Sequence, residues 1–147
     1  MKKHFLIIIL SLLCISAAKA QSGLNISPLF NDPGRWETMF TASHLEGRYL
    51  KPYNLTLFRS ITTRNSRIYD EIEQLVEKDG KNTIDKECGY VNGKLYYAFY
   101  LFEPKNKKYR YLFYRNSSLR VEEPNEVTVV YIEGYVTLEE LKKMFKK

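Results

Sequence analysis

The spacing of apolar residues along the chain changes from a strand pattern to a helix pattern and back. Residues 55–64 (LTLFRSITTR) are rich in β-branched and aromatic side chains, which predicts a strand. From Ile68 onward, apolar residues recur at i, i+4, i+7 and i+8, and this spacing predicts an amphipathic helix over 66–78. Gly80 is expected to end that helix in the left-handed conformation.

The alternating pattern returns after this helix and continues almost to the end of the chain. Strands are predicted over 84–91, 94–103, 109–115 and 126–133, after an earlier one over 36–44 (WETMFTASH). Asn92-Gly93 predicts a tight type I′ hairpin, and the capping box of Thr137 and Glu140 predicts a helix over 138–147. These elements predict an α+β fold, an antiparallel β-meander with two helices packed on one face of the sheet.

The N-terminal residues have the layout of a secretory signal peptide. A basic start precedes an apolar run over 5–15 and a small-residue pattern ending at Ala20, so we expect a signal peptide over 1–20 that is cleaved after Ala20. That run is shorter than the roughly 20 residues of a spanning helix, and no transmembrane segment is expected once the signal is removed. An irregular lead-in is predicted over 21–35, followed by a single α+β domain over 36–147.

Two cysteines bear on the fate of the exported chain. Cys14 follows an apolar run, as the acylated cysteine of a lipoprotein does, but Leu13 stands where that signal has a small residue. Cleavage after Ala20 would remove Cys14 and leave Cys88 alone, so no intramolecular disulfide is expected. A lone cysteine most simply acts as a small buried apolar side chain.

Charge adds little support for a nucleic-acid partner. The full chain carries a formal charge of +6, and loss of the three lysines within 1–20 lowers it to about +3. Neither this balance nor the expected export suits a nucleic-acid-binding protein, and no nucleic-acid partner is expected.

The stretch over 93–116 contains six tyrosines and three phenylalanines. If Asn92-Gly93 is a two-residue turn, Val91 lies opposite Lys94 and the register of the hairpin is fixed. Leu95, Tyr97, Phe99 and Leu101 then form a core row. The alternate residues Tyr96, Tyr100 and Phe102 then form an outer row, with Arg110 beside it. Such an outer row either stacks in cross-strand pairs without a ligand or offers an aromatic platform for a sugar ring, a peptide or a partner protein.

Candidate chemistry is sparse. His44 is the one histidine after residue 20, so a nucleophilic site would have to combine it with Cys88 or a serine. This alternative is a small hydrolase or transferase. No sequence pattern of a metal or phosphate site is present, and no cofactor is expected. The main hypothesis is therefore a non-enzymatic binding or structural module, with Tyr96, Tyr100, Phe102 and Arg110 as its candidate binding residues.

Four strings carry a resemblance over residues 47–145: GRYLKPYNLTLFRSITT, DGKNTIDKECGYVNGKLYYAFYLF, YRYLFYRN and IEGYVTLEELKKMF. They resemble a family of small exported proteins of Gram-negative gut bacteria that has no assigned function. The resemblance implies a location in the periplasm or at the cell surface. The partner expected for the aromatic outer row is an envelope protein or a glycan. Association through a sheet edge, with a partner or a second copy, is a further possibility.

Overall fold

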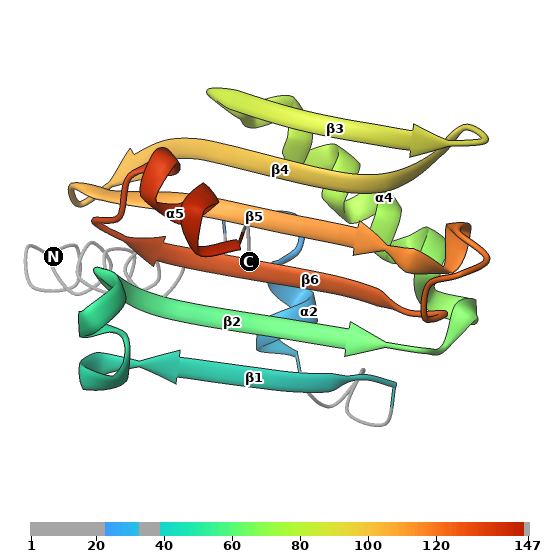
Figure 1. Ribbon diagram of the computed structural model, residues 1–147, viewed down its shortest axis with the longest axis horizontal. Coiled ribbons are helices and arrows are strands. Elements are labelled where there is room, and N and C mark those ends of the chain that lie inside the picture. Colours follow the sequence, from blue (N-terminus) through green and yellow to red (C-terminus); the bar gives the residue numbers. More distant parts are fainter. Residues whose placement is uncertain (1–22, 33–38, 146–147) are drawn as a thin grey trace, which may run out of the picture.

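Six antiparallel strands form one sheet in the order β1-β2-β6-β5-β4-β3 (Figure 1). The computed structural model describes residues 23–32 and 39–145. The predicted signal peptide, Cys14 and the first three residues of the strand predicted over 36–44 lie outside the described residues. The strands are β1 (Thr41–Glu46), β2 (Leu55–Thr63), β3 (Asp85–Val91), β4 (Lys94–Lys105), β5 (Lys108–Asn116) and β6 (Val127–Gly134).

Within the described residues, three α-helices accompany the sheet: α2 (Ser27–Asn31), α4 (Tyr69–Asp79) and α5 (Leu138–Phe145). Short 3₁₀ turns are η1 (Gly47–Tyr49), η2 (Lys51–Tyr53), η3 (Ser66–Ile68), η4 (Gly80–Asn82) and η5 (Ser117–Leu119). The α+β class and the antiparallel sheet are confirmed, and β3 to β6 form the predicted meander. No helix within the described ranges has both the length and the apolar composition needed to span a bilayer.

The helix ends follow from local chemistry, with one exception. The capping box is confirmed, because Thr137 N donates to Glu140 Oε2 (3.0 Å) and Glu140 N donates to Thr137 Oγ1 (3.3 Å). The left-handed conformation predicted for Gly80 is wrong, since its φ is −62° and the chain continues into η4. Glycine is needed there for space: a Cβ at this position would lie 2.6 Å from the hydroxyl oxygen of Tyr100.

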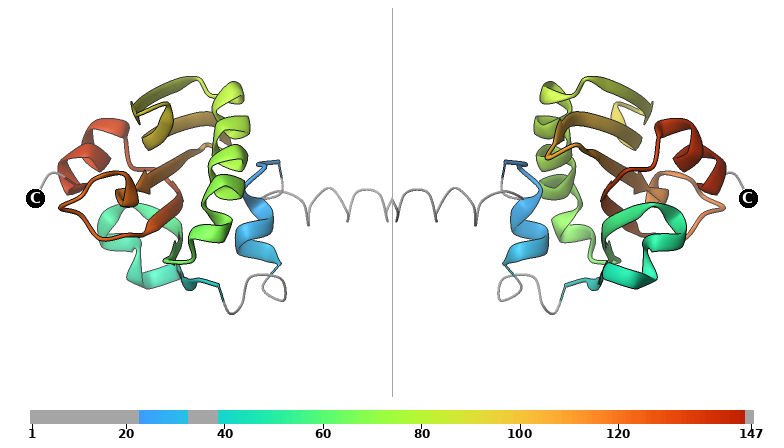
Figure 2. Two further views of the ribbon diagram at one scale, coloured as in Figure 1. Left: turned by 90° about the vertical axis from the view of Figure 1, so that its right-hand side faces the viewer. Right: turned by 90° about the vertical axis from the view of Figure 1, so that its left-hand side faces the viewer.

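The helices lie on opposite faces of the sheet (Figure 2). α4 and α2 pack on one face, here called the α4 face, and α5 packs on the other, here called the α5 face. The prediction that both predicted helices share a face is therefore wrong. The sheet supports two cores because both faces of β5 and β6 are apolar: Leu112 and Val129 lie under α4, and Tyr111 and Ile132 lie under α5.

The segment before β1, predicted to be irregular, contains the short helix α2. Pro28 stands in its first turn, where a missing N–H costs no hydrogen bond. Asp79, at the end of α4, accepts hydrogen bonds from Asn25 N (2.6 Å), Asn25 Nδ2 (2.9 Å) and Ile26 N (3.0 Å). The segment docks on the α4 face through apolar side chains, as Ile26 and Leu29 are buried.

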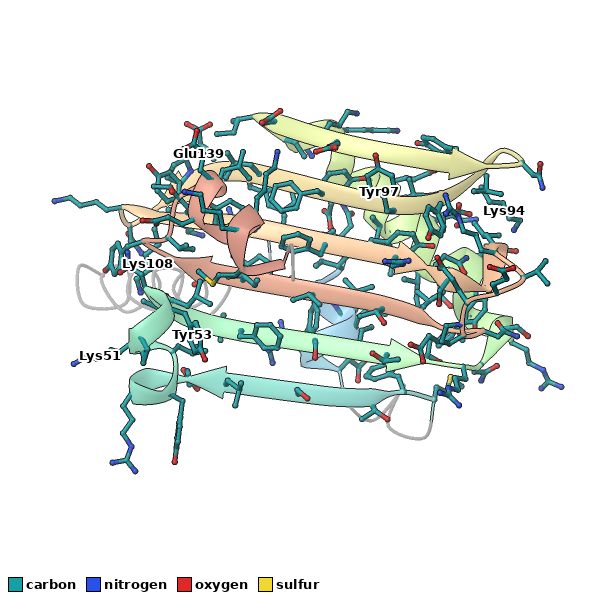
Figure 3. All side chains as sticks on the ribbon, viewed as in Figure 1. Lys51, Tyr53, Lys94, Tyr97, Lys108 and Glu139 are labelled. Atoms are coloured by element: carbon teal, nitrogen blue, oxygen red, sulfur yellow. The ribbon has the colours of Figure 1, made fainter. Side chains whose placement is uncertain are left out.

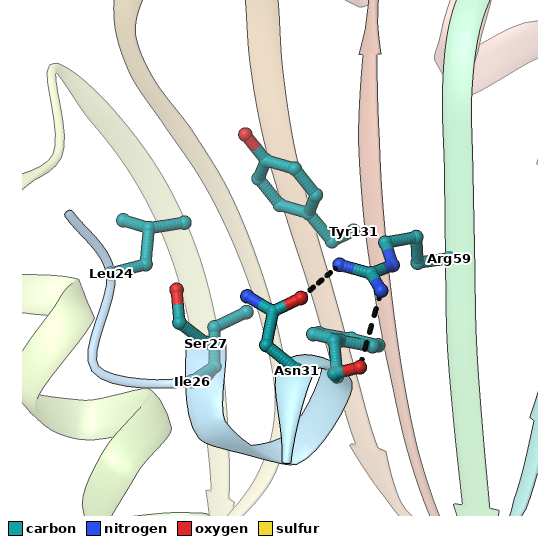
Figure 4. A pocket seen from close by; sticks show the side chains of 7 residues that line it. Leu24, Ile26, Ser27, Asn31, Arg59 and Tyr131 are labelled. Carbon is teal, nitrogen blue, oxygen red and sulfur yellow. Dashed lines mark hydrogen bonds between the residues drawn. The ribbon is translucent and has the colours of Figure 1, made fainter. Parts of the chain in front are cut away.

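Arg59 of β2 holds the other end of α2 (Figure 4). Its Nη1 donates to Asn31 Oδ1 (2.7 Å) and its Nη2 donates to the carbonyl oxygen of Phe30 (3.1 Å), while its guanidinium lies 5.5 Å from the centre of the Phe30 ring. Partial burial lowers the pKa of Arg59, and Glu46 opposes this change by raising it. A small hollow of about 10 Å³ lies between the docked segment, Arg59 and Tyr131.

A β-bulge interrupts the β3–β4 hairpin. The predicted turn is confirmed: Val91 pairs with Lys94, and Asn92 and Gly93 have φ values of 51° and 79°. The next pair, Tyr90 with Leu95, keeps this register. Gly89 then pairs with Tyr97, which leaves Tyr96 as an extra residue. One extra residue moves every later side chain of β4 to the opposite face from the one that an uninterrupted register predicts.

Candidate functional site

The predicted outer row is part of the α4-face core. Tyr100 and Phe102 are each 2% exposed and belong to the cluster that contains Ile72 and Val76 of α4. The prediction that they line an open face is wrong, because the bulge at Tyr96 turns them toward α4. Burial, with a nearby hydrogen bond to Cys88, raises the pKa of Tyr100 above its ordinary value.

Tyr96 and Arg110 are held by neighbouring side chains rather than presented to a partner. Tyr96 is 7% exposed, and its hydroxyl donates to Glu123 Oε1 (2.8 Å) and accepts from Arg115 Nη2 (2.9 Å). Arg110 is half-buried on the α4 face, where its Nε donates to the hydroxyl of Tyr131 (3.0 Å). The structure thus does not bring the four predicted binding residues together on one accessible surface.

A different set of residues forms the candidate site on the α5 face, from the edge of the part covered by α5 outward. Cross-strand pairing aligns one row across this face, namely Phe99, Phe113, Val130, Ser60 and Ser43. The next row is Gly89, Tyr97, Arg115, Thr128, Thr62 and Thr41. Figure 3 shows Tyr97 on the half of the sheet that α5 leaves uncovered.

These rows border a hollow of about 740 Å³, here called the Tyr97 groove. It is lined by Glu87, Tyr97, Ala98, Phe99, Phe113, Tyr114, Arg115, Thr128, Val130 and Lys142. Its size is within the range of sites that bind small molecules or short polymers, about 300–1,000 Å³. The lining combines aromatic rings with a few charged groups, which is the composition typical of a binding site.

The rings of the groove are fixed by their neighbours. Tyr97 is 36% exposed and rests on the backbone of Gly89, where an added Cβ would lie 2.3 Å from Tyr97 Cε1. Tyr96 meets this ring at 86° with centroids 6.1 Å apart, and Phe99 meets Phe113 at 69° and 4.3 Å. Such edge-to-face contacts favour one orientation of each ring, so little rotational freedom would be lost on binding.

Arg115 supplies the main polar group beside Tyr97. Its Nη2 donates to Glu123 Oε1 and to the Tyr96 hydroxyl, each at 2.9 Å, whereas its Nε and Nη1 make no hydrogen bond to any residue that the structure describes. The hydrogen bond to Glu123 raises the pKa of Arg115, and the hydrogen bond from Tyr96 lowers the pKa of Glu123. Arg115 therefore stays charged and keeps donors for a ligand.

Lys142 and Glu87 form the other charged border of the groove. The Lys142 ammonium lies 3.7 Å from Glu87 Oε2 and 5.9 Å from the centre of the Phe99 ring. Both side chains are about half exposed, so this ion pair is weak and can rearrange around a ligand.

The proposed pairing of His44 with Cys88 is wrong in its geometry. His44 lies on β1 and Cys88 on β3, the two opposite edge strands of the six-stranded sheet. His44 Nε2 lies 3.2 Å from Glu46 Oε1, and within the described part of the chain it makes no hydrogen bond to a serine. Cys88 is half-buried against the α4-face core, in keeping with the predicted packing role.

Metal ligands do not cluster in the described ranges: no group of three or more His, Cys, Asp or Glu side chains there could hold an ion. The lining of the Tyr97 groove offers rings, a hydroxyl group and single charges.

Sequence reasoning missed Tyr97 and Arg115 as site residues. One local signal could have found them: a glycine inside a strand often marks a bulge or the close approach of another group, and Gly89 does both. A bulge near Gly89 would have placed Tyr97, Phe99 and Leu101 on the less covered face.

Comparison with known families gives a match to the family model described as "Family of unknown function (DUF6108)" over residues 13–145, so the chain belongs to this family. No curated protein and no solved structure matches it. The resemblance to a family without an assigned function is confirmed, while export and a gut-bacterial source stay predictions.

Proposed function

We propose that this member of the DUF6108 family is an exported, non-enzymatic binding module of the cell envelope that captures its partner on the Tyr97 groove. The observation that carries the proposal is the ring of Tyr97, which α5 leaves uncovered, beside Phe99 and Phe113, which are partly buried against the α5-face core. The layout of residues 1–20 as a signal peptide supports the location.

The composition of the groove favours binding. Tyrosine, phenylalanine and arginine are enriched at the centres of interfaces because they combine a large contact area with few rotatable bonds or with directional hydrogen bonds. Here Tyr97 and Arg115 are direct cross-strand neighbours, and Phe113 lies in the adjoining row. Aromatic side chains that only stabilised the sheet could have been covered by a longer α5.

A double substitution of the rings tests this proposal. Tyr97→Ala with Phe113→Ala should weaken binding to a purified Gram-negative cell-envelope fraction by about ten-fold or more, because both stacking surfaces are lost. Sedimentation of the labelled protein with the envelope fraction measures the affinity, and circular dichroism checks the fold.

Tyr53→Ala is the matched control, since Tyr53 is an exposed tyrosine (54%) that does not line the groove. It should bind like the wild type. Equal binding by the double variant and the wild type would remove the Tyr97 groove as the site.

Association through the β1 edge is a second candidate. All six residues of β1 are exposed, and this edge strand contains neither Pro nor Lys, residues that protect exposed edges. The opposite edge, β3, carries Asp85, Lys86 and Glu87 and adjoins the bulge. An added strand is therefore better accommodated at β1 than at β3.

A mass measurement tests this second candidate. If two copies pair through β1, light scattering should give a dimer for the wild type and a monomer for Leu45→Lys, because like charges would face each other across the new strand pair. Tyr90→Lys, at an exposed position of β3, should remain a dimer. A monomeric wild type at about 100 µM, well above a typical micromolar Kd, would rule out this self-association.

A further inference from the structure

We infer that the partner held by the Tyr97 groove is a glycan, with one sugar ring stacked on Tyr97 and its hydroxyls bonded to Arg115 and Thr128. This inference rests on the proposed function and names the chemical class of its partner.

The position of the groove in the sheet disfavours an extended peptide. A peptide strand binds by adding to a free sheet edge, where backbone N–H and C=O groups are unpaired. The groove lies over β4, β5 and β6, and each of these strands is paired with a neighbour on both sides. Recognition at this place must therefore come from side chains.

The two sides of the uncovered face differ in chemistry. Toward β4 and β5 it presents the exposed ring of Tyr97, with Phe99 and Phe113 partly buried beside it. Toward β2 and β1 it continues into hydroxyl side chains, which are Thr128, Thr62, Ser60, Thr41 and Ser43. Thr62 and Thr128 are already linked through their hydroxyls at 3.2 Å. A sugar ring has a matching division, with an apolar C–H face and a rim of hydroxyl groups.

Tyr97 is suited to stack on such a ring. Its ring has Gly89 on one side, so that side is closed by backbone, and Tyr96 fixes it edge-on. Contact with the Gly89 backbone holds the Tyr97 ring in place before a ligand binds. Stacking of a sugar on this ring therefore costs little conformational entropy. A larger residue at position 89 would displace the Tyr97 ring from this position.

Polar groups stand where the edge of a stacked sugar would meet the sheet. Arg115 is paired across the strands with Tyr97 on one side and with Thr128 on the other. Its Nε and Nη1 donors have no partner among the described residues, and a hydroxyl or ring oxygen of a sugar can accept from them. Glu87 at the border can accept from a sugar hydroxyl in turn.

Selective destruction of the envelope components tests the inference. The wild-type protein is titrated with a Gram-negative envelope fraction that has been left untreated, digested with proteinase K, or oxidised with periodate and quenched. If the partner is a glycan, binding should survive proteinase K and fall at least ten-fold after periodate, which opens sugar rings at vicinal hydroxyls.

The other outcomes separate this inference from the proposed function. Loss of binding after proteinase K alone would overturn the glycan and leave the groove as a protein-binding site. Absence of binding to the untreated fraction would overturn the proposed function itself.

Gly89→Ala supplies the matching variant. It should weaken binding to the proteinase-treated fraction about ten-fold, since a Cβ at this position displaces the Tyr97 ring, and should alter thermal stability little because a side chain, not backbone, has to move. Gly23→Ala is the control, because a Cβ there meets none of the described residues within 4 Å. Should Gly89→Ala fail to fold, Tyr97→Leu removes the flat ring instead, and unchanged affinity of either folded variant would contradict the stacking.

Discussion

Replacing Phe102 by Ala is expected to lower the free energy of unfolding by about 3–5 kcal/mol, the range for removing a buried aromatic side chain. Phe102 is 2% exposed and packs edge-on against Tyr100 under α4, so its loss would leave a cavity in the α4-face core. Tyr97→Ala, five residues earlier on the same strand, should cost only about 1 kcal/mol because its side chain is partly exposed.

Urea denaturation of both variants measures this difference. An uninterrupted hairpin register reverses the order, with Tyr97 in the core and Phe102 outside, so a larger loss for Tyr97→Ala would contradict the bulge. The pair is informative because both substitutions remove one aromatic ring from β4.

Asp79→Ala is expected to lower the free energy of unfolding by about 1–3 kcal/mol and to release the segment that contains α2. The Asp79 carboxylate is buried and accepts three hydrogen bonds from Asn25 and Ile26. Alanine leaves the buried Ile26 N–H without its partner, whereas Asn25 is exposed and its donors can bond to water. Hydrogen exchange of the Ile26 and Leu29 amides, together with urea denaturation, measures both effects.

Protonation of Asp79 should also shape the pH dependence of stability. Burial raises the pKa of this carboxyl, and the hydrogen bonds from Asn25 and Ile26 offset only part of the rise. The folded protein therefore holds the proton more tightly than the unfolded chain, whose pKa is about 3.9. The contribution of Asp79 is largest below that value and decreases as the pH rises through the folded-state pKa.

Asp79→Asn, which cannot titrate, is the reference for this pH dependence. As the pH rises above about 4, the wild type should lose stability relative to Asp79→Asn, as measured by urea denaturation at each pH. A relative gain of the wild type over this range would show that the hydrogen bonds outweigh the burial of the charge.

Local patterns were enough to predict most elements but not the faces of β4. The turn at Asn92-Gly93 and the strands on either side are encoded by neighbouring residues. The bulge depends on distant groups, since the Tyr96 ring is held by Arg115 of β5 and by Arg120 and Glu123 from the segment after η5. These contacts lie outside the β3–β4 hairpin, so the hairpin sequence alone does not reveal them. One extra residue was enough to exchange the predicted core and outer rows.

The position of α5 has a similar origin. Its amphipathic pattern fits either face of the sheet, and the choice is made by the connection after β6. Tyr135 N (2.9 Å) and Val136 N (3.1 Å) both donate to the carbonyl oxygen of Asn54, and the Tyr111 hydroxyl donates to the carbonyl oxygen of Val136 (2.8 Å). These long-range bonds direct the chain onto the α5 face and leave the Tyr97 groove uncovered.

Hydroxyl-radical footprinting with mass-spectrometric readout of Tyr97 and Tyr100 tests most directly whether Tyr97 forms the binding surface. In the free protein, Tyr97 should be oxidised and Tyr100 should not, and addition of the proteinase-treated envelope fraction should protect Tyr97. Oxidation of Tyr100 with protection of Tyr97 in the free protein would contradict the bulge, and an accessible Tyr97 that the bound partner leaves unprotected would contradict its role in binding.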